Sequence, residues 1–135
     1  MDLSKSMLIS ASGMKAQSLR MRIISENMAN ADSLPSSPEQ DPYRRKTVTF
    51  ANVLNRQAGV EEVKVRRVDY DRSEFGMTYQ PGHPGADADG YVRTPNVNTL
   101  LEVMDMRQAQ RSYEANVNAM ETARTMMMRT IDLLR

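Results

Sequence analysis

The first thirty residues carry an apolar side chain at every seventh position. These positions hold Met7, Met14, Met21 and Met28. A seven-residue repeat kept over three heptads is typical of the seam of a coiled coil. The companion row is mixed, because it places Ser10 and Gln17 beside Ile24. The pattern predicts a helix from Asp2 to about Asn30, which needs a packing partner because an isolated helix gains most of its stability from contacts.

A second heptad pattern runs from about residue 96 to the end of the chain, with interruptions at Gln110 and Arg124. Its rows hold Val103, Met106, Tyr113, Val117, Met120, Met127, Ile131 and Leu134. Thr99 and Glu102 have the spacing of a capping box, although Asn96 or Asn98 could cap this helix instead. We expect the two terminal helices to pair as an antiparallel coiled coil. The assembly seam is predicted to comprise these eight residues together with Met7, Met14, Met21, Ile24 and Met28.

The middle of the chain has the pattern of short strands and turns. Pro35 ends the first helix, because proline lacks the backbone donor and disfavours helix in the residue before it. The β-prone runs lie at 48–50, 60–70 and 77–79. The predicted fold is therefore mainly α with a small β insert. Residues 1–32 and 94–135 form one coiled-coil domain, and residues 33–93 form a linker and a small, loop-rich β domain.

The longest β-prone run has a break in its alternation. Val63 and Val65 alternate in one phase, whereas Val68 and Tyr70 alternate in the other. A shift by one residue moves side chains to the opposite face of a strand. We therefore expect a bulge between the two pairs, which would keep one face of the whole run buried.

The composition removes most kinds of chemistry. The chain of 135 residues has no Cys, no Trp and one His, but 12 Met. Disulfides, thiolate metal sites and cysteine nucleophiles are therefore excluded. His83 lies in a turn-rich stretch with no nucleophile motif beside it, and the chain has no glycine-rich phosphate-binding loop. We expect no enzymatic activity, cofactor or small-molecule substrate.

The run from Asp87 to Gly90 resembles part of a calcium-binding EF-hand loop. Aligning Gly90 with the glycine of that loop places Gly85 where the first aspartate ligand should stand. The same alignment places Asn96 where the bidentate glutamate should stand. Two of the strongest ligands are missing, so the run is predicted to be a polar turn and no metal site is expected.

Charge and hydropathy exclude two further classes of protein. The 18 basic residues nearly balance the 17 acidic ones, and aromatic residues make up 5% of the chain. A nucleic-acid-binding protein would show a basic surface with stacking side chains, so no nucleic acid is expected as a partner. No segment is long and apolar enough to span a membrane, and the N-terminal pattern is that of a helix rather than of a cleaved signal peptide.

The methionines exceed what one helix pair can bury. The run Met126–Met128 points in three successive directions around the C-terminal helix. A helix that is apolar in several directions has more than one packing partner. An antiparallel pair buries one stripe of each helix, so the surplus predicts assembly into a larger bundle or filament.

The chain resembles a known family at several motifs. Ala11–Gln17 and Ser25–Ser33 are similar to the N-terminal signature of the flagellar rod and hook proteins. Pro81–Val92, Pro95–Asn98 and Ser112–Asn116 resemble the proximal-rod members of that family in particular. The resemblance extends over essentially the whole chain.

The resemblance implies a structural subunit of the bacterial flagellar basal body. It implies a rod that transmits motor torque across the periplasm, with the terminal helices packed helically around a channel and the middle segment outside them. Further copies of the chain, other flagellar rod proteins, the basal-body ring and the export apparatus are the implied partners in a helical homo- and hetero-oligomer. Type III export without a cleaved signal peptide is implied as well.

Asn27 and Asn30 are expected to cap the first helix and set the exit of the chain. The alternative is a monomeric coiled-coil adaptor or export chaperone that binds one partner.

Overall fold

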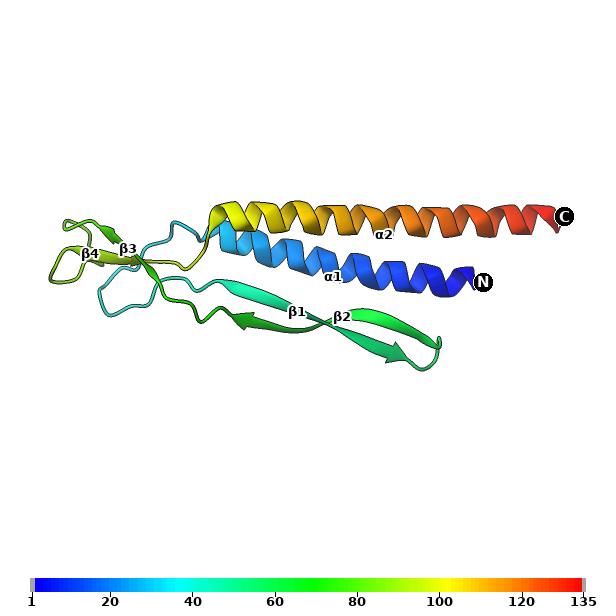
Figure 1. Ribbon diagram of the computed structural model, residues 1–135, viewed down its shortest axis with the longest axis horizontal. Helices are drawn as coiled ribbons and strands as arrows, with labels where there is room; N and C mark the ends of the chain where they lie inside the picture. The colour runs from blue at the N-terminus through cyan, green and yellow to red at the C-terminus, as the bar shows by residue number, and fades with distance from the viewer. Residues whose placement is uncertain (1, 135) are drawn as a thin grey trace. The chain divides into compact units, whose positions relative to one another are not determined.

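The computed structural model describes residues 2–134, which form two long helices and two small sheets (Figure 1). Helix α1 spans Leu3–Ala29, and helix α2 spans Thr99–Leu133. The strands are β1 (Lys46–Asn55), β2 (Val60–Tyr70), β3 (Gly76–Tyr79) and β4 (Tyr91–Thr94). Strand β1 pairs with β2, and β3 pairs with β4. The prediction of helices at both ends of the chain, with a small β region between them in sequence, is confirmed.

The chain divides into two compact units, and each contains parts of both helices. Unit 1 runs to Met21, from Val48 to Arg67, and from Arg107 onward. Unit 2 comprises Arg22–Thr47 and Val68–Met106. Within the described residues, no helix is long and apolar enough to cross a membrane.

Small side chains line the contact between the two helices in unit 1, where α1 and α2 run antiparallel (Figure 1). The buried residues of this contact are Ser10, Ala16, Ala109 and Ala123. The helices are close at Gly13, where an added Cβ would lie 2.7 Å from Oδ1 of Asn116. The Asn116 side chain fills that space, so glycine is what allows the helices to come so near to each other.

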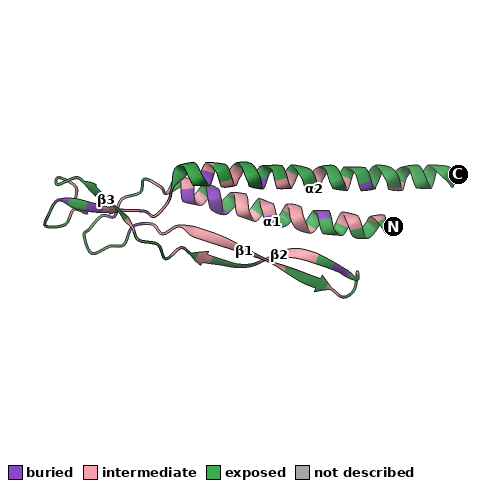
Figure 2. Ribbon diagram, in the orientation of Figure 1, coloured by how far each residue is buried: buried purple, intermediate pink, exposed green. Residues whose placement is uncertain are grey.

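The heptad rows predicted as the assembly seam are mostly half-buried. The half-buried members are Met7, Met14, Met21, Met28, Val103, Met106, Tyr113, Val117, Met120 and Met127. Ile24 is buried, whereas Ile131 is 49% and Leu134 83% exposed. Most of α2 is exposed (Figure 2). In unit 1 the innermost row of α2 is a different heptad, formed by Ala109, Asn116 and Ala123. The methionine row of α2 lies three residues before this row in sequence, and the role of the predicted rows as an assembly seam stays a prediction.

The first hairpin packs against α1 in unit 1. Val60 is buried, and the backbone N–H of Val63 donates to the Ser12 hydroxyl at 3.2 Å. Further along β2, in unit 2, Val68 is 40% and Tyr70 is 61% exposed. The expectation that a bulge keeps one face of the whole run buried is therefore wrong. Val60 is the one residue of β2 that is buried, so the burial is confined to the start of the strand.

The second hairpin, in unit 2, has one largely open face and one face that is covered on β4 but not on β3. Its register pairs Thr78 with Val92 and Tyr79 with Tyr91. Side chains alternate along a strand, so Thr78 and Val92 share one face while Met77, Tyr79 and Tyr91 share the other. Val92 is fully buried, although Thr78 beside it is exposed. On the other face Met77, Tyr79 and Tyr91 are exposed, and Arg93, the register partner of Met77, is half-buried.

The loop of this hairpin contains the run that resembles a calcium-binding loop. Oδ1 of Asp87 accepts hydrogen bonds from the backbone N–H groups of Asp89 and Tyr91, at 3.0 and 2.8 Å. Gly90 has φ of 87°, in the left-handed region that favours glycine. Asp87 thus organises a tight polar turn before β4, as the sequence predicts.

Candidate functional site

Asn98 caps helix α2. Its Oδ1 accepts hydrogen bonds from the backbone N–H groups of Leu100 and Leu101 at 3.1 and 3.3 Å. The capping box predicted from Thr99 and Glu102 is therefore wrong, and the alternative cap at Asn98 is confirmed. The Glu102 carboxylate is unavailable for capping because it is fully buried and bonded elsewhere.

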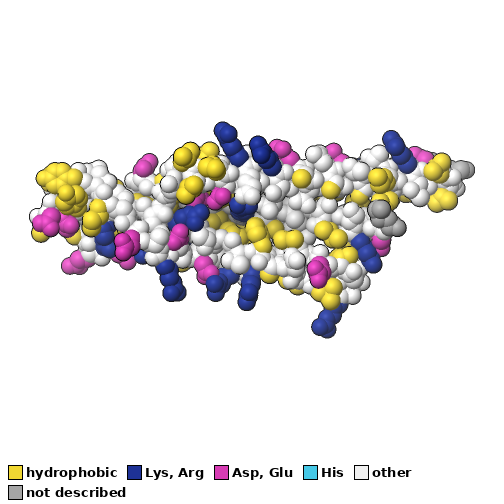
Figure 3. Space-filling model, viewed as in Figure 1, with side chains coloured by type: hydrophobic (Ala, Val, Ile, Leu, Met, Phe, Trp, Pro, Cys, Tyr) yellow, Lys and Arg dark blue, Asp and Glu magenta, His cyan; other side chains and the backbone are white. Residues whose placement is uncertain are grey.

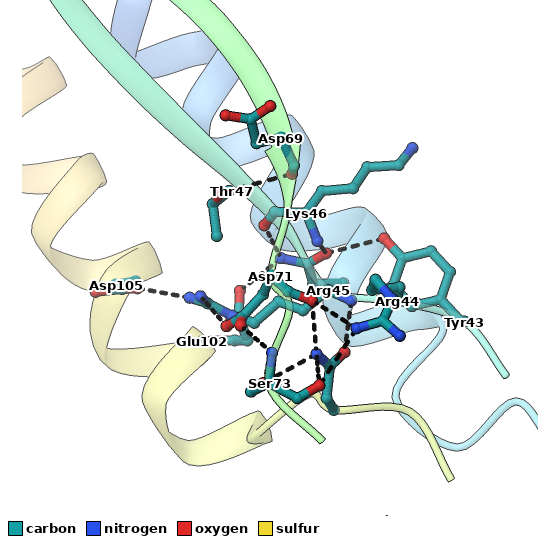
Figure 4. Close-up of polar contacts among 12 residues, drawn as sticks. Tyr43, Arg44, Arg45, Lys46, Thr47, Asp69, Asp71, Ser73, Glu102 and Asp105 are labelled. Carbon is teal, nitrogen blue, oxygen red and sulfur yellow. Dashed lines mark hydrogen bonds and ion pairs between the residues drawn. The ribbon is translucent and has the colours of Figure 1, made fainter. Parts of the chain in front are cut away.

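Glu102 lies at the centre of a buried polar cluster in unit 2 (Figure 4). Its Oε1 accepts a hydrogen bond from Nε of Arg45 at 2.5 Å. Its Oε2 accepts one from Nδ2 of Asn27 at 3.1 Å. A buried carboxylate is costly unless it is paired and hydrogen-bonded. Here each carboxylate oxygen has a partner, from a different part of the chain.

Arg45 joins three segments through one guanidinium group. Besides Glu102, it lies 3.5 Å from Oδ2 of Asp71 and 3.6 Å from Oδ2 of Asp105. Burial alone would lower the pKa of Arg45. Hydrogen bonding and charge attraction from Glu102 and Asp71 offset that effect, so the pKa is raised. The guanidinium therefore stays charged and connects α2 to the residues after β2 and to those before β1.

Asn27 fastens the start of β1 to the last turn of α1. Its Nδ2 donates to the carbonyl oxygen of Lys46, and its Oδ1 accepts from the N–H of the same residue, both at 2.9 Å. The Tyr43 hydroxyl also donates to Oδ1 at 2.9 Å. Burial raises the pKa of this Tyr43 hydroxyl. Asn27 is 1% exposed, so the whole amide is used inside the protein.

Asn30 closes the end of α1. Its side-chain Nδ2 and its backbone N–H both donate to the carbonyl oxygen of Glu26, at 2.8 and 3.1 Å. The two asparagines expected at the helix exit therefore bond to different groups. Asn30 satisfies a carbonyl of the last helical turn, whereas Asn27 reaches β1 and Glu102.

Asn96 holds the segment between β2 and β3. Its Oδ1 accepts from the backbone N–H of Arg45 at 2.8 Å, and its Nδ2 donates to the carbonyl oxygen of Asp71 at 3.0 Å. The Arg44 guanidinium donates to the same carbonyl at 3.0 Å and lies 4.2 Å from the centre of the Phe75 ring. The connection between the two hairpins is thereby bonded to residues on both sides of it in sequence.

Every charged group of this cluster is bonded to a neighbour, so the arrangement is suited to positioning segments rather than to binding a substrate. The sequence-based interpretation missed the cluster because Glu102 looked like a helix cap and Arg45 looked like part of a solvated basic run. One signal could have found it. Glu102 begins the heptad row that continues through Ala109, Asn116 and Ala123, so it occupies an inward-facing position.

Acid is expected to weaken unit 2. Hydrogen bonds from Ser73, together with Arg45, lower the pKa of Asp71, and a hydrogen bond from Lys46 lowers the pKa of Glu26. A carboxyl with a lowered folded-state pKa contributes stability above its ordinary pKa, which is about 4, and loses that stability as the pH falls from there through the folded-state pKa.

Hydrogen exchange of the Lys46 amide across this pH range measures the effect. In the double variant Asp71→Asn with Glu26→Gln, the exchange rate is divided by the intrinsic rate of an unprotected amide at the same pH. This ratio should depend less on pH than in the native protein. Glu39→Gln, at an exposed carboxylate, is the control and should retain the native dependence. Equal pH dependence in all three proteins would contradict the assignment.

Comparison with known proteins agrees with the motifs. Residues 7–33 match the family described as flagella basal body rod protein. Residues 88–133 match the family described as flagellar basal body rod FlgEFG protein C-terminal. The chain is 50% identical to the flagellar basal-body rod protein FlgC of Agrobacterium fabrum, over 98% of this chain and 96% of the relative. The chain belongs to the FlgC family of flagellar basal-body rod proteins.

Other FlgC proteins are similar over almost their whole length. FlgC of Bacillus subtilis is 40% identical over 95% of each chain. FlgC of Escherichia coli O6:H1 is 40% identical over 93% of this chain and 92% of the relative. The resemblance to flagellar rod proteins is therefore confirmed, and the protein is a rod component of the flagellar basal body. The two matched ranges include Asn27 and Glu102, which bond to each other in the polar cluster.

Proposed function

We propose that this FlgC-family protein is a structural subunit of the proximal rod, which assembles helically through its terminal helices and transmits motor torque across the periplasm. The observation that supports this most directly is the apolar surface of α2 in unit 1. Its exposed apolar residues, each at least 49% exposed, are Met126, Met128, Ile131, Leu133 and Leu134. A large apolar surface around a helix indicates contacts with further chains.

The packing of the helix pair explains why this surface is available. The two helices approach through small residues such as Gly13 and Ala109, so the predicted methionine seam is left only half-buried. In the proposed rod, these methionines and the exposed end of α2 pack against neighbouring subunits as an inner coiled-coil layer formed by residues 1–32 and 94–135. Residues 33–93 form the outer module.

Helical assembly and torque transmission follow from the type of contact. A contact between two different surfaces that does not close on itself generates a filament. Densely packed helical layers deform little and can therefore transmit force. The proposed partners are further copies of this chain, other flagellar rod proteins, the basal-body ring and the export apparatus. In this proposal the chain is exported by that apparatus without cleavage of a signal peptide. The paired charges of the polar cluster support a structural protein rather than an enzyme.

Substituting the exposed end of α2 tests this proposal. Ile131→Asp combined with Leu133→Asp is expected to abolish swimming and to remove the protein from isolated basal bodies. The monomer should still fold, because both side chains are exposed, at 49% and 87%. Circular dichroism of the purified variant checks that its helix content is unchanged. Thr125→Asp adds the same carboxylate at an exposed polar position of α2 and should leave swimming intact.

The alternative of a monomeric adaptor makes a different prediction. An adaptor or export chaperone would be absent from basal bodies even in its native form, and it would remain a compact monomer in solution. Normal incorporation of the double aspartate variant would contradict assembly through this part of α2.

A further inference from the structure

The open face of the second hairpin is an exposed aromatic surface in unit 2. Met77, Tyr79 and Tyr91 are 64%, 63% and 44% exposed, and the strand register places them together. The two tyrosine rings meet edge to face, with centroids 5.3 Å apart. On the opposite face Val92 is fully buried, whereas its register partner Thr78 is exposed. We call the exposed trio of Met77, Tyr79 and Tyr91 the aromatic face.

The start of α2 carries a second exposed apolar surface in the same unit. Leu100, Leu101 and Met104 are 70%, 54% and 59% exposed. The inward side of these turns is fixed by Glu102, so the three apolar side chains are left outside. Figure 3 shows hydrophobic side chains gathered over this part of α2, with Lys and Arg side chains beside them. We call Leu100, Leu101 and Met104 the leucine patch.

Among the described residues, the charges without an ion-pair partner beside the two surfaces have opposite signs, since Arg93, which shares the aromatic face with Met77, is paired with Asp41. Asp87 and Asp89 are exposed in the loop that joins β3 to β4, and neither has an ion-pair partner among residues 2–134. Beside the leucine patch, Arg107 follows Met104 by three residues on the same helix, which places both on one side of it. Arg107 is exposed and likewise has no ion-pair partner within the described part of the chain.

We propose that the aromatic face of one copy of this chain docks on the leucine patch of a second copy, with Asp89 opposite Arg107. Two different, complementary surfaces on one chain give a head-to-tail contact, which repeats along a filament instead of closing on itself. Tyr and Met are typical of interface cores, and opposite charges at the rim set the orientation of the partners. The inference rests on the proposed function, because it names one surface through which rod subunits would meet.

Disulfide cross-linking between two tagged copies tests the contact. The chain has no cysteine, so each introduced thiol is unique. One copy carries Tyr79→Cys and one tag, the other carries Leu101→Cys and a second tag, and both are expressed together. Oxidation of isolated basal bodies should give a dimer that carries both tags. A disulfide requires Cα atoms within about 7 Å, so the cross-link reports direct contact.

The neighbouring residue on β3 supplies the matched control. Thr78→Cys lies on the opposite face of the hairpin and is also exposed. Paired with Leu101→Cys, it should give at least about fivefold less dimer than Tyr79→Cys, since adjacent strand residues point to opposite faces.

Charge reversal tests the orientation separately. Added to every copy in the cross-linking strain, Asp89→Arg or Arg107→Asp alone should lower the Tyr79→Cys to Leu101→Cys dimer yield about threefold, the size expected for one exposed ion pair. Both reversals together restore opposite charges and should restore the yield.

Two results would overturn the inference while leaving the proposed function in place. One is basal bodies that contain the protein and give no more dimer from Tyr79→Cys than from Thr78→Cys. The other is a disulfide from Tyr79→Cys to a cysteine introduced into a different rod protein, formed in place of the one to the second copy. Absence of the native chain from basal bodies would overturn the proposed function and this contact together.

Discussion

Replacing Glu102 with alanine should lower the free energy of unfolding by about 3–5 kcal/mol, because it leaves the Arg45 guanidinium without its closest counter-ion in a half-buried site. It also removes the acceptor for the Asn27 amide, which is 1% exposed. Urea denaturation of the purified chain, followed by circular dichroism, measures the loss. The exchange rate of the Lys46 amide should rise as well, since Asn27 bonds to that residue.

Three further variants separate this effect from the loss of any ion pair. Asp41→Asn removes a surface pair with Arg93 in the same unit, where Asp41 is 70% exposed. Such pairs contribute about 1 kcal/mol or less. Glu102→Leu combined with Arg45→Met should be more stable than Glu102→Leu alone, because it removes the charge that the single variant leaves without its buried partner. A loss below about 1 kcal/mol for Glu102→Ala would show that the cluster is not a main source of stability.

Gly85→Ala should destabilise unit 2 by about 1–3 kcal/mol, the range for overpacking a filled site. A Cβ at this buried position would overlap the backbone carbonyl oxygen of Pro35 and lie 3.2 Å from Nδ1 of His83. A backbone carbonyl cannot rotate away as a side chain can, so the loop or the segment around Pro35 must move. The urea midpoint of the purified variant gives the size of the effect.

The same loop provides a neutral comparison. An added Cβ at Gly82 meets nothing within 4 Å, so Gly82→Ala should leave the urea midpoint unchanged or slightly raised. If Gly82→Ala and Gly85→Ala behaved alike, the close approach between Gly85 and Pro35 would not be a feature of the folded protein.

The helices were predictable because their signal is local and long. Heptad spacing, the proline after α1 and the cap at Asn98 all lie within or next to the helix that they define. Which heptad row of each helix faces the other helix was less predictable. Large apolar residues mark a heptad row most clearly, yet helices that approach closely put their smallest residues inside. Gly13 and Ala109 therefore face the partner helix, and the methionines are left half-buried.

The polar cluster was harder to predict because its contacts are distant in sequence. Glu102 and Arg45 are 57 residues apart, and Glu102 and Asn27 are 75 apart. A glutamate in the first turn of a helix can bond to the helix N-terminus or to a distant cation, and only the tertiary fold decides between them. Strand β4 was missed for a related reason. Its four residues gain their strand conformation from pairing with β3 across the intervening loop.

The Asn27 side chain joins helix α1 to strand β1 in the way that a neighbouring strand would. A primary amide presents the same donor and acceptor as a peptide group. By bonding to both the N–H and the C=O of Lys46, Asn27 imitates one residue of a neighbouring strand. The last turn of α1 thus supplies β1 with a substitute edge partner at its first residue. Helix and sheet are therefore connected here by the hydrogen-bond pattern of a β-ladder. An aspartate at position 27 would lack the N–H donor that bonds to the carbonyl oxygen of Lys46.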